Sequence, residues 1–191
     1  MLGLAEGDGL TPGPFALIES ALRAAGIERE QVECIAVGRG PGSYTGVRSA
    51  IALAQGWQLA LDVKLLGVST ADVLAATARV AGLTGRVAVV IDALRGEFYS
   101  ASYELTADGS RELAPLRLLQ REAVEALAAG GELLVSPDAK CPFAGARLLS
   151  PAAGELGRLA AARSDFQPGE QLEPIYLRET TFVKAPPPRF Y

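Results

Sequence analysis

The sequence contains no histidine among its 191 residues. This excludes, for this chain, a Ser-His-Asp triad, a cysteine nucleophile assisted by histidine, and the usual histidine-containing zinc sites. Metal-dependent hydrolysis would have to rest on carboxylates alone. Only two cysteines occur, Cys34 and Cys141, and neither belongs to a Cys-x-x-Cys motif. We interpret both as buried, inert thiols and expect no disulfide, as is typical of proteins from a reducing compartment.

Long apolar runs are also absent, and so is an excess of positive charge. No run approaches the roughly 18 to 20 residues that span a bilayer, and the N-terminus lacks a basic region followed by an apolar one. We therefore expect a cytoplasmic protein with no membrane partner. Eighteen Lys and Arg residues face 22 Asp and Glu residues, which gives a net charge of -4. Such a chain has no electrostatic footprint of its own for RNA or DNA, so nucleic acid would require a basic partner.

The hydrophobic pattern is that of a globular α/β protein and divides the chain near residue 84. Residues 1–84 predict a helix at 15–25, a strand at 33–37, a helix at 43–61, a strand at 65–68 and a helix from 70. Residues 85–180 predict strands at 86–91, 97–103 and 113–119, a helix at 121–129, a strand at 132–135 and a helix at 152–162. Together the halves suggest a duplicated βββαβα unit whose first copy lacks its opening strands. Residues 181–191 form a proline-rich tail, which favours an extended polyproline segment.

The loop between the first predicted strand and the long helix is rich in glycine. It comprises Gly38, Arg39, Gly40, Pro41, Gly42, Ser43, Tyr44, Thr45, Gly46 and Arg48. Such a loop places backbone N–H groups at a positive helix N-terminus, where an anion or a partner's backbone could approach. It does not fit a Walker A loop, a dinucleotide fingerprint or a nucleophile elbow. A tight turn in which Ser43 or Thr45 caps the helix is the plain structural interpretation.

Two stripes run along the predicted helix at 43–61 when successive residues are placed about 100° apart. One stripe suits the core of its own lobe: Val47, Ala50, Ala54, Trp57 and Leu61. The other carries short side chains: Thr45, Ser49, Ala52 and Gly56. Because short side chains let a second helix approach closely, and Arg48 is the only charge in the segment, the second stripe requires its own partner. That partner is either the helix at 15–25 or another molecule, and the sequence leaves both open.

Four pieces of the sequence occur in an order that matches a known family. The run at 38–48, Gly-Arg-Gly-Pro-Gly-Ser-Tyr-Thr-Gly-Val-Arg, is similar to the signature G-R-G-P-G-S-[FY]-T-G-[LV]-R. Gly-Val-Ser-Thr follows at 67–70, the run at 92–99 is similar to D-A-R-x-G-E-[VF]-Y, and the run at 173–178 is similar to E-P-x-Y-L-R. On these pieces, which lie within residues 10–180, the chain resembles the TsaB family, also called YeaZ.

The resemblance implies an actin-like, Hsp70-like (ASKHA) fold with lobes at 1–84 and 85–180. It implies a role in making threonylcarbamoyladenosine at position 37 of tRNAs that read codons starting with A. There the family resembles a non-catalytic dimerisation partner of a TsaD-like transferase, which a TsaE-like ATPase joins. Members self-associate when alone, and tRNA is reached only through the complex. The chain would have no cofactor of its own, and ATP or ADP would be bound by or shared with the partner subunits. Members usually open with a strand carrying an I-D-T-S-like segment and a hairpin, which this chain lacks.

Asp92, Arg95 and Glu97 lie in the turn between two predicted strands of the second lobe. In an actin-like ATPase this turn is glycine-rich and cradles phosphate, whereas Leu94 and Arg95 occupy it here, so an open nucleotide clamp is not expected. Asp92 and Glu97 are possible Mg²⁺ ligands. We favour a solvated turn with a salt bridge and expect no metal site. Two function classes remain open: a non-catalytic scaffold, which the missing histidines favour, and a small-molecule kinase or peptidase of the same fold.

Overall fold

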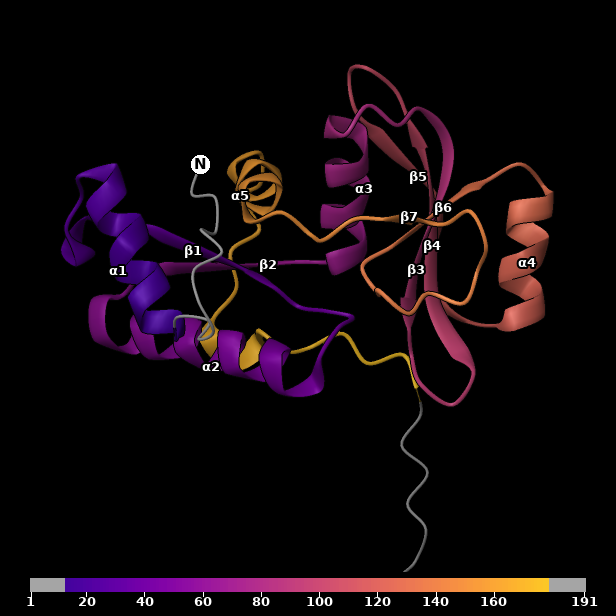
Figure 1. Ribbon diagram of the computed structural model, residues 1–191. Helices are drawn as coiled ribbons and strands as arrows, with labels where there is room; N and C mark the ends of the chain where they lie inside the picture. Colours follow the sequence, from indigo (N-terminus) through magenta and orange to yellow (C-terminus); the bar gives the residue numbers. More distant parts are fainter. Residues whose placement is uncertain (1–12, 179–191) are drawn as a thin grey trace, which may run out of the picture.

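The structure is a computed structural model that describes residues 13–178 of the chain. Residues 1–12 and the proline-rich tail considered above lie outside these described residues. Within them, helices and two sheets form an α/β fold (Figure 1). The α/β class predicted from the sequence is therefore confirmed.

The smaller sheet consists of two parallel strands, β1 and β2, joined by a long helix, α2. A helix, α1, and a short 3-10 helix, η1, precede it. The bounds are α1 Pro14–Ala25, η1 Arg29–Gln31, β1 Cys34–Gly38, α2 Tyr44–Leu61 and β2 Lys64–Val68. Although α2 is 18 residues long, no helix in the described part of the chain combines the length and hydropathy that crossing a membrane requires.

The larger sheet has five strands in the order β5-β4-β3-β6-β7. Strands β3, β4 and β5 form an antiparallel meander, while β6 runs parallel to β3 and β7 runs parallel to β6. The bounds are β3 Gly85–Asp92, β4 Glu97–Leu105, β5 Ser110–Gln120, β6 Leu133–Ser136 and β7 Arg147–Leu148. The short β7 has no strong sequence signal and was not predicted.

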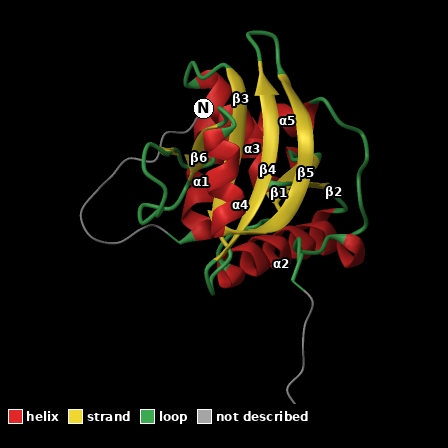
Figure 2. Ribbon diagram, turned by 90° about the vertical axis from the view of Figure 1, so that its right-hand side faces the viewer, coloured by secondary structure: helices red, strands yellow, loops and turns green. Residues whose placement is uncertain are grey.

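Alternation along β3 explains how the larger sheet is covered on both faces. Val87, Val89 and Ile91 pack against α3 (Thr70–Val80), whereas Ala88 and Val90 turn to the opposite face, where α4 (Arg121–Ala129) lies. Figures 1 and 2 show α3 and α4 on the two sides of this sheet. Because both faces are buried, β3 reads as a continuous apolar run.

The chain returns to the smaller sheet after the larger one is complete. Helix α5 (Ala153–Ala161) packs through Leu156 and Leu159 against Leu66 and Val68 of β2, on the side of the sheet away from α2 (Figure 1). The short helix η2 (Gly169–Gln171) then follows, and Leu172 enters the core that α2 forms with β1 and β2. Each sheet is thus covered in part by a helix from the other predicted lobe: α3 packs on the larger sheet and α5 on the smaller one.

The prediction that Cys34 is buried is wrong, because β1 lies at an open edge of its sheet. The amide of Lys64 donates to Glu33 O at 2.9 Å and that of Arg39 to Val68 O at 2.8 Å. The backbone N–H and C=O groups of the odd-numbered residues along β1 therefore point to β2. Even-numbered residues then present their backbone groups to the other side, where no further strand pairs within residues 13–178. Cys34, the first residue of this edge strand, is exposed, Cys141 is only partly buried, and both are free thiols.

Candidate functional site

A cleft of about 920 Å³ lies between the two sheets, and all four pieces of the sequence signature contribute to it. Strands β1, β2, β3 and β6 all point their carboxyl ends at this cleft, because residues just after each strand line it. The carboxyl ends of parallel strands are where α/β proteins commonly bind ligands, because the following loops separate there. The lining includes Arg39, Gly40, Pro41, Gly42, Ser43, Tyr44, Thr70, Asp92, Leu94, Arg95, Tyr99, Asp138, Ile175, Tyr176 and Arg178.

The side chain of Arg39 holds one wall of the cleft together. Its Nε donates to Glu173 O at 2.8 Å, and its own carbonyl accepts from Ile175 N at 2.8 Å. Its aliphatic stem lies directly on Gly67 of β2, where an added Cβ would come within 2.0 Å of Arg39 Cδ and 2.9 Å of Leu172 Cδ1. Glycine is required at position 67 because any side chain would occupy the space of the Arg39 stem.

The glycine-rich loop turns from β1 into α2 in the way the sequence predicts. Ser43 caps the helix, since its Oγ accepts a hydrogen bond from Gly46 N at 3.3 Å. Gly40 has a φ of 89°, which side chains disfavour, and its carbonyl accepts from Thr70 N at 2.8 Å. The loop is therefore tied to the start of α3 as well as to α2.

The turn between β3 and β4 forms the opposite wall. Asp92 Oδ1 accepts from Leu94 N at 2.7 Å, and the next residues, Leu94 and Arg95, both take positive φ values of 61° and 59°. Such values are costly for residues other than glycine, and they turn both side chains outward at the rim of the cleft. Asp92 thus organises the turn, while Arg95 is exposed.

Arg178 provides the salt bridge expected in this turn, although neither Asp92 nor Arg95 takes part in it. Its Nη2 lies 2.5 Å from Glu97 Oε2 and donates to the carbonyls of Ala93 and Leu94 at 3.0 and 3.2 Å. Residues 173–178, which we call the strap, thus run from Arg39 of the smaller sheet to the β3–β4 turn of the larger one. Of the two proposed Mg²⁺ ligands, Glu97 is occupied by Arg178.

Arg48 and two tyrosines meet where the strap passes the start of α2. Arg48 Nη1 donates to Tyr44 OH at 2.8 Å and to Tyr176 OH at 3.2 Å, and its guanidinium lies 5.1 Å from the centre of the Tyr44 ring. The hydrogen bond to Tyr176 is the main cause that raises the pKa of Arg48. All three side chains are exposed, so the cluster forms part of the surface.

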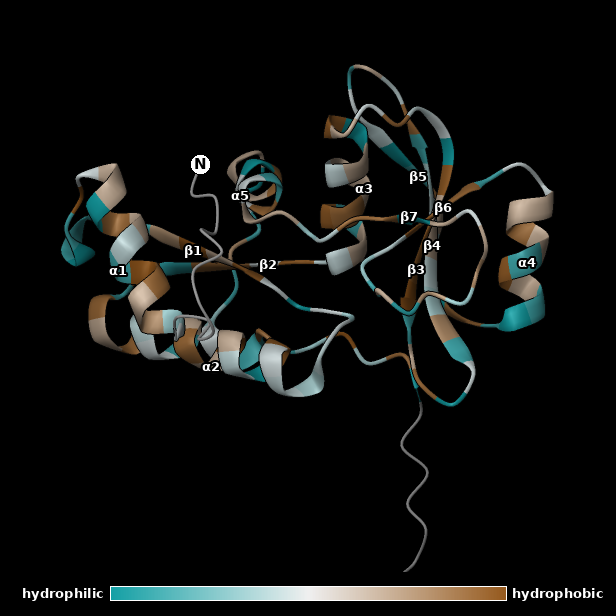
Figure 3. Cartoon of the chain, viewed as in Figure 1, coloured by the Kyte–Doolittle hydropathy of each residue, from teal (hydrophilic) through white to brown (hydrophobic). Residues whose placement is uncertain are grey.

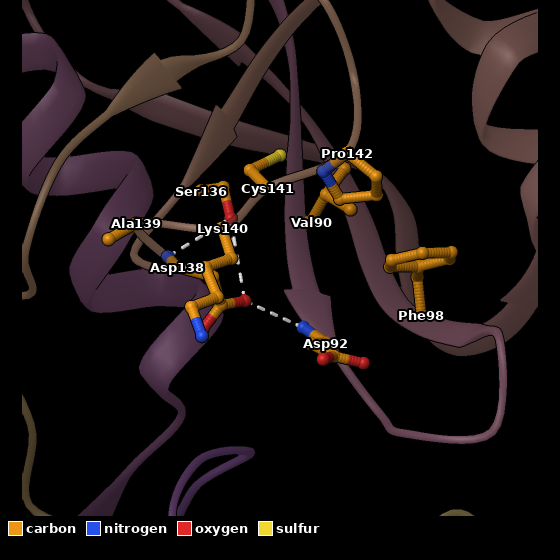
Figure 4. A pocket seen from close by; sticks show the side chains of 9 residues that line it. All are labelled: Val90, Asp92, Phe98, Ser136, Asp138, Ala139, Lys140, Cys141 and Pro142. Atoms are coloured by element: carbon orange, nitrogen blue, oxygen red, sulfur yellow. Dashed lines mark hydrogen bonds between the residues drawn. The ribbon is translucent and has the colours of Figure 1, made fainter.

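A smaller cavity of about 270 Å³ adjoins the cleft and shares Asp92 and Asp138 with it (Figure 4). Asp138 Oδ2 accepts from Asp92 N at 2.8 Å, and Ser136 Oγ accepts from Asp138 N at 3.2 Å, which fixes the ends of β3 and β6 together. No group of three or more Asp, Glu, Cys or His residues suited to a metal exists between residues 13 and 178.

The outer face of α2 is the second feature of functional interest. Its short side chains, Thr45, Ser49, Ala52 and Gly56, are all exposed, so no helix of the described chain covers them. Leu59 continues this stripe and is 90% exposed. Figure 3 colours most of α2 white to brown, which reflects how few polar residues it carries.

The inner face of α2 differs from the predicted core stripe at two positions. Ile51 and Ala54 are buried against β1 and β2, with Val47 and Trp57 partly buried beside them. Ala50 and Leu61, which were predicted to lie in the core, are exposed. The buried face is centred on Ile51 and Ala54. Ala50 and Leu61 lie at the flanks of that face.

One further residue of the site, Asp138, has a position in the sequence that indicates a functional role. Asp138 follows the buried strand β6 at its carboxyl end, which is a typical position for a ligand-binding carboxylate. Tyr176 and Arg178 belong to a recognised motif, but their partners, Arg48 and Glu97, are 128 and 81 residues away in the sequence. Only the folded chain identifies those pairs.

The comparison with known proteins gives consistent matches. The profile of TsaD, described as tRNA N6-adenosine threonylcarbamoyltransferase, matches residues 15–144. The tRNA threonylcarbamoyladenosine biosynthesis protein TsaB of Escherichia coli K12 is 40% identical over 94 residues, which are 49% of this chain and 40% of that protein. TsaB of Bacillus subtilis 168 is 34% identical over 87 residues, 46% of this chain and 37% of that protein. The matched part therefore spans less than half the length of these curated relatives.

Solved structures match over a larger share of the chain. YeaZ from Pseudomonas aeruginosa superposes with a TM-score of 0.70 at 32% identity, covering 85% of this chain and 82% of that one. A Pseudomonas aeruginosa protein described as similar to the peptidase YeaZ gives a TM-score of 0.73 at 32% identity, covering 86% and 82%. The similarity thus includes both sheets.

The packing of Arg39 on Gly67 leads to a prediction. Gly67→Ala should lower the free energy of unfolding by about 1–3 kcal/mol, because the new methyl group displaces the Arg39 stem and its bond to Glu173. Gly157→Ala in α5 is the matched control, since nothing lies within 4 Å of its added Cβ. That variant should be stabilised by up to about 1 kcal/mol. Urea unfolding of both variants measures the difference, and equal stabilities would refute the role assigned to Gly67.

The salt bridge between the strap and the β3–β4 turn leads to a second prediction. Arg178→Gln should destabilise the protein by about 1–3 kcal/mol, because it leaves the half-buried Glu97 carboxylate without its cation. Amide hydrogen exchange should accelerate at Leu94 and Glu97, whose amides donate hydrogen bonds within this turn. Arg163→Gln breaks the more exposed pair with Asp165 and should cost about 0–1 kcal/mol. Unchanged exchange in the turn would show that Arg178 does not hold it.

Proposed function

The chain belongs to the TsaB (YeaZ) family, and on that premise we propose that it is a non-catalytic dimerisation subunit in threonylcarbamoylation of tRNA adenosine 37. The tRNAs concerned read codons that start with A. Its partners are a TsaD-like transferase and a TsaE-like ATPase in the cytoplasm, and it pairs with a second copy when alone. Relatives named for threonylcarbamoyladenosine biosynthesis support the pathway. Any ATP or ADP is bound by or shared with the partners, and tRNA is reached through the complex.

The observation that carries this proposal is the exposed outer face of α2. A helix whose only charge is Arg48 and whose outward residues are short or apolar exposes a surface suited to helix packing. Monomeric proteins seldom leave such faces open, and large exposed apolar surfaces commonly mark protein contacts. Helix α1 is likewise uncovered within the described chain, since none of its residues is buried and Phe15 is 67% exposed. We assign the partner interface to Thr45, Ser49, Ala52 and Gly56.

We also propose that the α/β fold is an actin-like, Hsp70-like arrangement of two related lobes. The parallel pair β6–β7 followed by α5 parallels the pair β1–β2 followed by α3, and α3 and α5 contact each other between the sheets (Figure 1). Helices α1 and α4 precede β1 and β6 in the same way. These correspondences support a duplicated unit, of which the first copy lacks three opening strands within the described residues.

The cleft supports a structural role for the chain more than a catalytic one. Ser43 Oγ is engaged in capping α2, Asp92 in holding its turn, and Glu97 in the salt bridge to Arg178. The sequence also has no histidine to act as a general base. One structural relative is described as similar to a peptidase. Within residues 13–178, the side chains named here leave neither a kinase nor a peptidase activity an evident nucleophile or base.

Isolated activity provides one test. The purified chain should hydrolyse neither ATP nor a peptide library at a rate above that of buffer. Turnover that persists through successive purification steps and disappears in Asp92→Ala would contradict the non-catalytic role and would favour an enzyme that uses the cleft.

The interface provides a more direct test. Gly56→Leu should weaken self-association and binding to the TsaD-like transferase by about tenfold to a hundredfold, because overpacking a contact costs roughly 1–3 kcal/mol. Sedimentation over a concentration series measures the first and calorimetric titration the second. Gly157→Leu, which adds the same side chain to another exposed helix glycine, should leave both constants unchanged. A Gly56→Leu variant that loses thermal stability but associates normally would remove the interface from this face.

A further inference from the structure

The guanidinium of Arg48 has one edge engaged and one edge available. Nη1 donates to the hydroxyls of Tyr44 and Tyr176, which uses both of its hydrogens. The Nε–H and Nη2–H groups have no partner among residues 13–178. This second edge carries two parallel donors, a geometry that binds a carboxylate through two hydrogen bonds.

The tyrosines restrict where that edge can point. The guanidinium lies 5.1 Å from the centre of the Tyr44 ring, and the Tyr44 and Tyr176 ring centres are 6.4 Å apart. Tyr176 belongs to the strap, which is fixed at its two ends through Arg39 and Arg178. Arg48 is thereby held in one orientation before any partner arrives, which reduces the entropy lost on binding.

We infer that Arg48 receives an Asp or Glu carboxylate from a heterologous partner helix laid along α2, and that it selects this partner over a second copy of the chain. The inference rests on the proposed function, whose interface it extends from the short stripe to the Tyr44–Arg48–Tyr176 cluster. Arg48 is the only charged residue between Tyr44 and Leu61, so it alone can supply charge complementarity on this face of α2. Arginine and tyrosine are also enriched among residues that dominate binding energy.

A second copy does not satisfy Arg48 on the same face. Two copies related by a twofold axis and packed about Ala52 place Arg48 opposite Gly56 of the other copy. Helix α2 contains neither Asp nor Glu, so it offers no carboxylate to Arg48 in such a pairing. Self-association through α2 alone therefore leaves the available edge of Arg48 without an anionic partner.

A phosphate of RNA has the same chemistry but fits the surroundings less well. Phosphate-binding surfaces gather several Lys and Arg side chains, because affinity for nucleic acid grows with the number of neutralised phosphates. Along α2 the residues next to Arg48 are short or apolar, and the whole chain carries a net charge of -4. The surroundings favour a protein helix with one carboxylate.

The experiment compares two equilibria for the same variants. Binding to the TsaD-like transferase of the same organism is titrated by calorimetry, and self-association is measured by sedimentation. Arg48→Met should weaken binding to the transferase by about tenfold or more, the typical effect of removing a charge-assisted pair, and should change self-association less than about twofold. Arg48→Lys, which keeps the charge but loses the fork, should lie between Arg48→Met and the native chain. Arg163→Met, at the exposed pair with Asp165, is the matched control and should change neither equilibrium.

Each other result decides against the inference. Equal losses in both equilibria would make a second copy the partner of Arg48, and no loss in either would leave Arg48 without a binding role. Normal assembly with the transferase, combined with weaker tRNA binding by the assembled pair, would assign Arg48 to an RNA phosphate. If the native chain fails to bind the transferase at all, the proposed function itself fails. A native chain that binds, with Arg48→Met binding equally well, overturns only the inference.

Discussion

The contact on which the rest of the structure depends is the stem of Arg39 lying across Gly67, with its Nε bonded to Glu173 O. It brings together the loop after β1, the strand β2 and the strap, which come from three distant parts of the sequence. The strap then reaches the β3–β4 turn through Arg178, so the wall of the cleft is continuous from one sheet to the other. Without a glycine at position 67, the Arg39 stem has no room in this place, and the strap loses its attachment at the smaller sheet.

Helix α2 has two faces of different composition, one for the core and one exposed. Its inner residues, Ile51 and Ala54, fill the core beneath β1 and β2, and its outer residues are short, so a second helix can approach the backbone. A larger side chain at Gly56 overpacks nothing within the chain itself, because nothing lies within 4 Å of the position of its Cβ. The exposed face therefore adds little to the stability of the chain itself, and the proposed helix contact accounts for its composition.

Local patterns were sufficient to predict most elements, while pairings between distant residues were not. The period of apolar residues and the cap at Ser43 predicted α2 and the strands on either side of it nearly to the residue. The burial of Cys34 was predicted wrongly, because a strand's own residues do not reveal whether it lies at an edge of the sheet. Leu61 was placed in the core for a related reason: a stripe at helical spacing fixes the periodicity but not the centre of the buried face. The partner of Glu97 required the fold, because Arg178 reaches it only through the path of the strap.

The strap also connects the start of α2 with the rim of the cleft through hydrogen bonds. Tyr176 contacts Arg48 at the start of α2, and Arg178, two residues later, holds the carbonyls of Ala93 and Leu94 at the rim of the cleft. A partner helix that draws Arg48 toward its own carboxylate changes the hydrogen bond to Tyr176, and a molecule in the cleft that displaces the β3–β4 turn changes the contacts of Arg178. If both events displace the same six residues, the free energy of one depends on the other, and the dependence is equal in both directions. Binding at α2 and occupation of the cleft are therefore coupled through the strap to the extent that each one moves it.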